Sequence, residues 1–423
     1  MTRETLTIEA LDRRGDGVAY CDGQPLTVPG ALPGDVVTGV LEVSRVAQFE
    51  LVSASAIRTE PHCVHFVQCG GCSVQHMKPE AYRDWKRGLV IDALTAHGIA
   101  IAVEGPSECQ PRSRRRATFT LARQGTGDVS IGFMARGTRE QIPLSTCEVI
   151  TKGMQELWPV LKRLGAAYIP AGRRGQIAVL HAENGFDLNF RTPEPLSEKT
   201  KRALLAECQK TLIVRLTANR ETLFQREKPR LSFGEIPIKP PPGAFAQAVK
   251  TAENEMVTLV LAHLKKAKKI ADLFSGMGTF SLRLAQIANV HAIENDSPAL
   301  RALTEAWRES ATKFKLRKIA TEKRDLFRAP LSVKELNAFD GIVFDPPRAG
   351  AEAQSKMLAK STVPKVAAVS CNPETLSRDL RILTDGGYKL ERVVAIDQFL
   401  WSSHVEAVAL LSKQKTRPKR GLG

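Results

Sequence analysis

The sequence predicts an α/β fold for the C-terminal part of the chain, a doubly wound Rossmann-like domain, preceded by an N-terminal OB-like β-barrel and a central β-rich domain. Beyond residue 240, apolar strand candidates alternate with helical stretches, which is the pattern of a mostly parallel sheet covered by helices. Near the N-terminus, short apolar runs are separated by Gly and Asp turns instead. With 423 residues, 43% of them hydrophobic, the chain is long enough for several domains with their own cores.

These patterns divide the chain into four regions. Residues 1–60 read as the barrel, a type of fold that often binds nucleic acid. Residues 61–240 contain a cysteine cluster, a helix near 80–97 and the long β-rich stretch, and this helix is a candidate to pack on the α/β domain instead. The run Pro240-Pro-Pro-Gly243 breaks regular structure. The α/β domain then extends over 241–412, and residues 413–423 form a basic tail without apolar periodicity.

Charge and cysteine content indicate the partner and the compartment. Lys and Arg number 61 against 45 Asp and Glu, a formal charge of +16, which favours binding to a polyanion such as nucleic acid. A generic basic enzyme surface is the alternative. No signal-peptide pattern and no run of about 18 apolar residues occurs, so we expect neither export nor membrane insertion. Three of the eight cysteines lie within ten residues, which favours a metal or catalytic use in the reducing cytoplasm.

A glycine turn between a strand and a helix marks a candidate cofactor site. Asp272 begins the segment Asp-Leu-Phe-Ser-Gly-Met-Gly278, and Glu294 closes the next strand 22 residues after Asp272. Glycines allow the backbone to approach a ligand, and an acid at the second strand end can hold ribose hydroxyls. Ser281 stands at the third fingerprint position, which disfavours a dinucleotide. A nucleoside cofactor is therefore predicted here, with a plain turn as the alternative.

Two later strand ends carry reactive groups at the same edge of the predicted sheet. Asp345-Pro-Pro-Arg348 resembles the fourth motif of S-adenosylmethionine methyltransferases, but Arg348 replaces the aromatic residue that clamps a base in amino-group enzymes. Cys371, in Ser-Cys-Asn-Pro373, ends the following strand. A small buried apolar residue is one reading of this cysteine, and an exposed nucleophile is the other.

The nucleophile reading explains a reaction at carbon 5 of uracil. This carbon is too poor a nucleophile to accept a methyl group unaided, but addition of a thiolate at carbon 6 produces an enolate that is nucleophilic at carbon 5. A base must then remove the carbon 5 proton. Glu406 begins a strongly apolar strand, where a buried carboxylate can serve as this base. A structural acid in a salt bridge is the alternative.

The cysteine cluster predicts a metal site. Cys63, Cys69 and Cys72 surround a Gly-Gly turn, Cys147 is a candidate fourth ligand, and Cys109 competes for that role. Four cysteines suit either zinc or an iron-sulfur cluster, and the spacing leaves both open.

A run of basic residues lies nearby. Arg112-Ser-Arg-Arg-Arg116 carries four guanidinium groups in five residues. We interpret it as a phosphate clamp, with a solvated charged turn as the alternative.

Taken together, these motifs resemble the bacterial RNA 5-methyluridine methyltransferase family over nearly the whole chain, and specifically its TRAM-containing branch that acts on 23S ribosomal RNA. The resemblance implies that residues 1–60 are a TRAM-like RNA-binding barrel and that the cofactors are S-adenosylmethionine and a 4Fe-4S cluster. It implies three groups of site residues: the catalytic Cys371 (nucleophile) and Glu406 (base); the donor contacts Gln247, Phe274, Glu294 and Asp345; and the metal ligands Cys63, Cys69, Cys72 and Cys147. Ser275 and Thr279 depart from residues common in the family.

The function implied is methylation of carbon 5 of a specific uridine, in 23S ribosomal RNA, through a covalent bond between Cys371 and carbon 6. A transfer RNA uridine-C5 methyltransferase is one alternative, and a non-catalytic, metal-containing RNA-binding factor is another. RNA cytosine enzymes usually have a cysteine in the fourth motif, and Asp345-Pro-Pro-Arg has none. RNA is the expected partner, and no membrane or protein partner is predicted.

Overall fold

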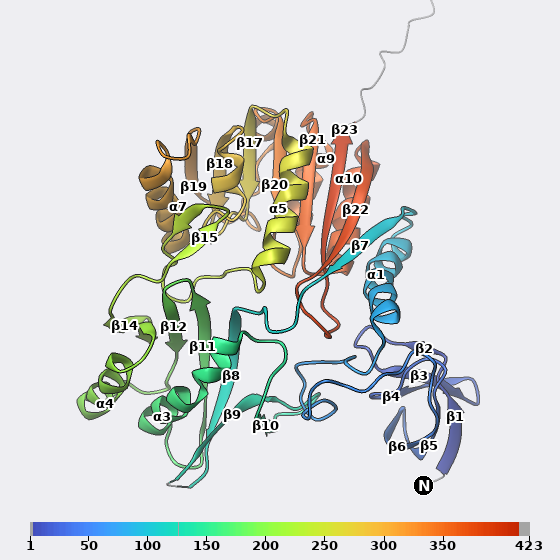
Figure 1. Cartoon of the computed structure of the whole chain (residues 1–423). Coiled ribbons are helices and arrows are strands. Elements are labelled where there is room, and N and C mark those ends of the chain that lie inside the picture. Colours follow the sequence, from blue (N-terminus) through green and yellow to red (C-terminus); the bar gives the residue numbers. More distant parts are fainter. Residues whose placement is uncertain (1–2, 126, 414–423) are drawn as a thin grey trace, which may run out of the picture. The chain divides into compact units, whose positions relative to one another are not determined.

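The computed structural model describes residues 3–125 and 127–413, which divide into two compact units (Figure 1). The first unit comprises the chain up to Lys86 together with Glu108–Glu227 and Gln398–His404. The second comprises Arg87–Ser107, Lys228–Asp397 and the chain from Val405 onward. The predicted basic tail lies outside the described residues, apart from residue 413.

A six-stranded sheet forms the N-terminal part of the first unit. Its order is β1-β5-β6-β4-β3-β2, with neighbouring strands antiparallel except for the pair β4 and β6. The strands are β1 (Arg3–Thr7), β2 (Ala10–Leu11), β3 (Gly17–Cys21), β4 (Gln24–Val28), β5 (Val36–Glu42) and β6 (Arg45–Ser53). Alternate side chains, among them Leu6, Ala19 and Val37, pack into one apolar core. Short strands and Gly-containing turns therefore produce the small β-domain that the sequence predicts.

The remainder of the first unit is built on a seven-stranded sheet with the order β10-β9-β8-β11-β12-β13-β14. These strands are β8 (Arg116–Arg123), β9 (Val129–Met134), β10 (Gln141–Pro143), β11 (Arg174–Ala182), β12 (Gly185–Phe190), β13 (Ile213–Ala218) and β14 (Glu221–Gln225). Three helices accompany it, α2 (Lys152–Glu156), α3 (Trp158–Tyr168) and α4 (Glu198–Gln209). Phe119 and Leu188 of the strands pack with Leu161 and Leu204 of the helices in a single core.

The second unit is a doubly wound α/β domain, which confirms the predicted fold class. Its eight-stranded sheet has the order β19-β18-β17-β20-β21-β23-β22-β7 (Figure 1). The strands are β7 (Val103–Glu108), β17 (Lys269–Leu273), β18 (Asn289–Glu294), β19 (Ile319–Lys323), β20 (Gly341–Phe344), β21 (Lys365–Ser370), β22 (Tyr388–Asp397) and β23 (Glu406–Lys413). The helices are α5 (Lys250–Leu264), α6 (Ser281–Leu284), α7 (Ser297–Ser310), α8 (Val333–Leu336), α9 (Glu352–Ala359) and α10 (Pro373–Asp385), and a hairpin of β15 (Leu231–Phe233) and β16 (Ile236–Ile238) precedes them.

Helix α1 (Pro79–Ala96) continues from the first unit into the second. Its C-terminal half contributes Val90 and Leu94 to the apolar core of the α/β domain. The helix predicted near 80–97 therefore has one half in each unit. The domain boundaries at residues 60 and 240 stay predictions.

The direction of the central strands determines where functional groups can gather. Strands β17, β18, β19, β20 and β21 are parallel, and the central strands β17, β20 and β21 are almost fully buried, as expected for a sheet covered on both faces. Strand β23 is antiparallel to β21 and pairs Ala407 with Ser370. The residues that follow β20 and β21 therefore meet the first residue of β23 at one edge of the sheet. No described helix is both long and apolar enough to cross a membrane.

Candidate active site

Three predicted site residues, Asp345, Cys371 and Glu406, lie at neighbouring strand ends of the α/β domain. Asp345 directly follows β20, Cys371 directly follows β21, and Glu406 is the first residue of β23. Since Ser370 pairs with Ala407, the strand register brings Cys371 beside Glu406. The thiol is partly exposed, whereas Glu406 is only 3% exposed. The structure thus brings together the nucleophile and the base that were predicted from separate motifs.

The surroundings of Cys371 favour its protonated form. Burial raises the pKa of the Cys371 thiol to about 11, and the negative charges of Glu406 and Asp345 act in the same direction. Arg348 opposes them through its positive charge and a hydrogen bond to the sulfur. Glu406, Asp345 and Arg348 all act on the pKa of Cys371, which indicates that they lie in one site. Arg348 is the one cation of this group that favours the thiolate.

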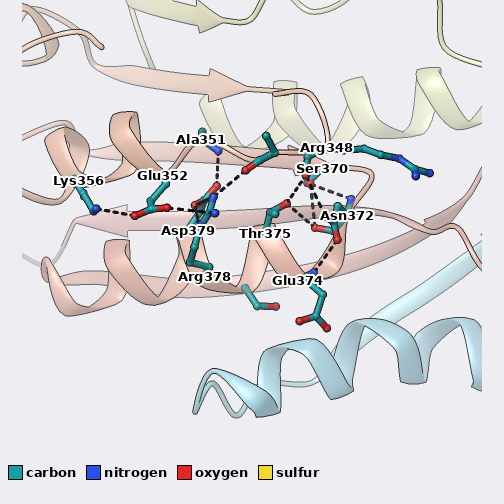
Figure 2. A network of polar contacts seen from close by, with 12 residues as sticks. Arg348, Ala351, Glu352, Lys356, Ser370, Asn372, Glu374, Thr375, Arg378 and Asp379 are labelled. Carbon is teal, nitrogen blue, oxygen red and sulfur yellow. Dashed lines mark hydrogen bonds and ion pairs between the residues drawn. The ribbon is translucent and has the colours of Figure 1, made fainter. Parts of the chain in front are cut away.

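A polar network fixes the loop that carries Arg348 against helix α10 (Figure 2). The Arg348 carbonyl accepts hydrogen bonds from Asn372 Nδ2 (3.0 Å) and Thr375 Oγ1 (3.2 Å). Farther along the loop, the backbone N–H of Ala351 donates to Asp379 Oδ2 at 2.6 Å. The Arg348 side chain extends away from this network (Figure 2). The backbone of this loop is therefore held against α10, while the Arg348 guanidinium group acts on Cys371.

Two carboxyl groups, one partly and one fully buried, lie where the methyl donor is predicted to bind. Asp345 Oδ2 accepts a hydrogen bond from Gln247 Nε2 at 3.1 Å, and burial raises the pKa of Asp345 to about 7 even though this bond lowers it. Asp272, which is fully buried, accepts a bond of 2.6 Å from Ser281 Oγ. Burial likewise raises the pKa of Asp272 to about 7. Both carboxyl groups would gain from a ligand that supplies a positive charge or hydrogen-bond donors.

The glycine turn after β17 leaves room for such a ligand. Gly276 has φ +54°, and a Cβ built on it would meet no atom within 4 Å, so this backbone borders open space. Its N–H donates to Glu294 Oε2 at 3.0 Å. Phe274 also adopts a left-handed conformation, with φ +60°. The predicted donor contacts Gln247, Phe274, Glu294 and Asp345 thus all belong to segments at this edge of the α/β domain.

Two further residues near this site were missed by the sequence reasoning. Asp325 and Phe327 follow β19, the third parallel strand, and the Phe327 ring lies 5.4 Å from the Phe274 ring. The side chain of Phe327 is 49% exposed. The signal available in the sequence was positional, because these residues follow a strand end at the same sheet edge.

The four predicted metal ligands line one cavity in the first unit. This cavity, of about 460 Å³, has Cys63, Cys69, Cys72 and Cys147 among its lining residues, and Cys109 is not among them. The pKa of the Cys72 thiol is raised to about 12, mainly by burial and in the same direction by the neighbouring cysteines. Among the described residues, however, no group of three or more His, Cys, Asp or Glu side chains is arranged to hold a metal ion.

The arginine-rich stretch, predicted to be a phosphate clamp with a solvated charged turn as the alternative, is partly buried. Arg115 is 7% exposed, and Arg112 forms an ion pair with Glu148 at 2.8 Å. Burial lowers the pKa of Arg114, whose guanidinium lies over the ring of Phe399 at 5.7 Å. The stretch precedes and enters a buried strand, so the alternation of β-structure turns some of its side chains inward. Arg114 and Arg115 therefore lie mostly in the interior of this unit.

Two parts of the chain match known protein families, and full-length relatives match nearly all of it. Residues 224–414 match the family model described as tRNA (Uracil-5-)-methyltransferase, and residues 2–38 match the TRAM domain. An uncharacterised RNA methyltransferase of Agrobacterium fabrum is 43% identical, covering 98% of this chain and all of the relative. The 23S rRNA (uracil(1939)-C(5))-methyltransferase RlmD of a Shewanella strain is 30% identical, covering 97% of this chain and 96% of the relative.

Among solved structures, the Pyrococcus abyssi tRNA (uracil-54, C5)-methyltransferase in complex with S-adenosyl-L-homocysteine superposes with a TM-score of 0.72 at 25% identity. The superposition covers 96% of this chain and 99% of the Pyrococcus chain. The fold and the strand-end site define an S-adenosylmethionine-dependent RNA methyltransferase. The chain belongs to the RNA (uracil-C5)-methyltransferase family.

The raised pKa of Cys371 makes a prediction about its reactivity. We expect alkylation of Cys371 by iodoacetamide to accelerate about tenfold per pH unit between about pH 7 and pH 10, because only the thiolate reacts and its fraction grows up to the pKa. Glu406→Gln removes a negative charge that raises this pKa, so the variant should react faster than the unchanged protein at about pH 8. Mass spectrometry of the peptide containing Cys371 measures both rates. A rate independent of pH, or slower alkylation of Glu406→Gln, would contradict the electrostatic description.

Proposed function

We propose that this protein methylates carbon 5 of one uridine in 23S ribosomal RNA through a covalent bond between Cys371 and carbon 6 of the base. The observation that carries the proposal is the meeting of Cys371, Asp345 and Glu406 at adjacent strand ends of the α/β domain. A thiol between two carboxylates matches a reaction that needs a nucleophile, a group near the methyl donor and a base.

The proposed reaction begins at Cys371. Its thiolate adds to carbon 6 of uracil, the carbon 5–carbon 6 double bond breaks, and the electron pair is delocalised over carbon 5 and the carbonyl oxygen at carbon 4. S-adenosylmethionine, when bound, would supply an electrophilic methyl group to carbon 5, with S-adenosylhomocysteine as the leaving group. Glu406 then accepts the proton from carbon 5, the carbon 5–carbon 6 double bond forms again, and the bond from carbon 6 to sulfur breaks to release the Cys371 thiolate.

The charges at the site assign separate tasks to the neighbouring groups. Arg348 favours the thiolate that must form before addition, because its charge and hydrogen bond lower the pKa of Cys371. Asp345, held by Gln247, belongs to the proposed donor side together with Phe274 and Glu294. Glu406 is almost fully buried at the start of β23. In this proposal it faces the uracil ring from the other side of the Cys371 thiol.

One finding favours ribosomal RNA over transfer RNA. The RlmD relative, named for a uridine of 23S rRNA, aligns with nearly the full length of this chain. The structural relative acts on transfer RNA, so a transfer RNA substrate is the second candidate.

We also propose that Cys63, Cys69, Cys72 and Cys147 bind a 4Fe-4S cluster. The support is that all four thiols line one cavity while Cys109 does not, and that an all-cysteine donor set suits such a cluster. Burial and mutual repulsion raise the pKa of the Cys72 thiol, and coordination to iron would relieve this repulsion because it binds the thiolates.

Deletion of the gene should remove 5-methyluridine from a single position of 23S ribosomal RNA and leave 5-methyluridine in transfer RNA unchanged. Mass-spectrometric mapping of both RNA classes, with and without the gene, measures this. Expression of the unchanged protein should restore the modification, and expression of Cys371→Ala should not. Loss of the transfer RNA modification alone would transfer the assignment to the second candidate.

The two catalytic residues should fail at different steps. Cys371→Ala should form no adduct, because the addition at carbon 6 cannot begin without the thiolate. Glu406→Gln should still add and methylate, but it should retain the carbon 5 proton and accumulate protein covalently joined to methylated RNA. Denaturing gel electrophoresis after incubation with RNA and S-adenosylmethionine detects this species. Normal turnover of Glu406→Gln without a trapped band would assign the base to another residue.

The cluster ligands can be separated from a matched cysteine. Cys69→Ser should lose iron and sulfide, lower the visible absorption near 400 nm and reduce the melting temperature, because cluster binding contributes to the stability of the fold. Cys109→Ser, which changes a buried cysteine outside the cavity, should keep its iron. Equal iron content in the two variants would contradict the proposed ligand set.

A further inference from the structure

The loop between β22 and β23 carries Glu406 at its end and is bound by helix α1. Residues 398–404 form this loop within the first unit, and Glu406 follows His404 by two positions in the chain. Lys86 of α1 donates through Nζ to the carbonyl of Phe399 at 3.2 Å and also to the carbonyl of His404. One ammonium group therefore holds both ends of the loop.

Lys86 is buried to an extent that is rare for lysine. Its exposed fraction is 0%, and it is among the largest fully buried side chains of the protein. A buried ammonium group costs several kcal/mol of desolvation unless its N–H groups are satisfied. A methionine or leucine at this position would fill similar volume without that cost, so packing alone does not account for a lysine here. Its specific contribution is that it donates hydrogen bonds to two carbonyl groups of one loop.

The middle of the loop is fixed by a second set of contacts. The backbone N–H of Trp401 donates to the hydroxyl of Tyr82, also on α1, at 2.8 Å. The carbonyl of Trp401 accepts hydrogen bonds from the N–H groups of Ser73 (2.6 Å) and Val74 (3.1 Å). Trp401 has φ +58°, a left-handed conformation that costs a non-glycine residue free energy and persists only when its surroundings hold it. The loop is therefore held in one conformation from outside itself.

We infer that Lys86 and Tyr82 are positioning residues for the base Glu406, and that the elimination half of the reaction depends on them. This inference rests on the proposed role of Glu406. The base must lie within hydrogen-bond reach of the carbon 5 proton, and a displacement of about 1 Å can reduce a rate by up to about 100-fold. Addition at carbon 6 depends on Cys371, which follows a different strand. Loosening the loop should therefore slow proton removal more than it slows addition and methyl transfer.

The test compares Lys86→Met with Lys78→Met in the full-length protein. Lys86→Met should accumulate the covalent complex with methylated RNA during steady-state turnover and lower kcat roughly 10-fold or more, while the single-turnover rate of methyl transfer stays within about twofold. Lys78, an exposed residue immediately before α1, is the control, and its variant should resemble the unchanged protein. Tyr82→Phe removes only the hydroxyl group that accepts the Trp401 N–H, and should show the same pattern in weaker form even if Lys86→Met does not fold.

Parallel measurement of Glu406→Gln separates the possible failures. If Glu406→Gln traps the covalent complex but properly folded Lys86→Met and Tyr82→Phe do not, the positioning role is wrong and the proposed function stands. If addition, methyl transfer and elimination all slow by the same factor in the α1 variants, the contacts stabilise the fold only and the inference is overturned. If Glu406→Gln traps nothing, its role as base fails, and the positioning role fails with it.

Discussion

The antiparallel direction of β23 is the constraint on which the site depends. In a wholly parallel sheet, strand beginnings and strand ends lie at opposite edges, so the first residue of a strand cannot meet the residues that follow its neighbours. Here β23 pairs antiparallel with β21, and Glu406 therefore begins at the edge where Asp345 and Cys371 follow their strands. A carboxylate more than thirty residues away in the chain reaches the thiol through strand direction alone.

A reversed strand also needs a connection that returns to this edge, and that connection is the loop of residues 398–404. Leu400 of this loop is buried in an apolar cluster with Val74 and Tyr82. Hydrogen bonds from α1 and from the segment after Cys72 add to this packing. Helix α1 and the segment after Cys72 thus both bind the backbone of one residue of the loop, Trp401.

Sequence patterns predicted the fold class and indicated candidate reactive groups because both depend on local order. Strand and helix periodicity identified the α/β domain, strand ends indicated Asp345 and Cys371, and the start of an apolar strand indicated Glu406. Contacts distant in the chain were not accessible in this way. Lys86 reads in the sequence as one more basic residue of an amphipathic helix, since its burial depends on a loop more than three hundred residues later. The arginine stretch at 112–116 was misinterpreted for the same reason, because composition does not reveal which side chains face a core.

The balance of charge at Cys371 explains why an arginine follows the two prolines of the Asp-Pro-Pro motif. An enzyme that attacks an exocyclic amine needs no thiolate and can use that position to clamp the base with an aromatic ring. Here burial raises the pKa of Cys371, the proposed nucleophile, to about 11, and the negative charges of Glu406 and Asp345 act in the same direction. The guanidinium of Arg348, which stays charged at any physiological pH, lowers this pKa and so offsets part of the rise. The polar network that holds the Arg348 carbonyl keeps this compensation in place, so the residue that departs from the amine-methyltransferase motif is the one that thiolate chemistry requires.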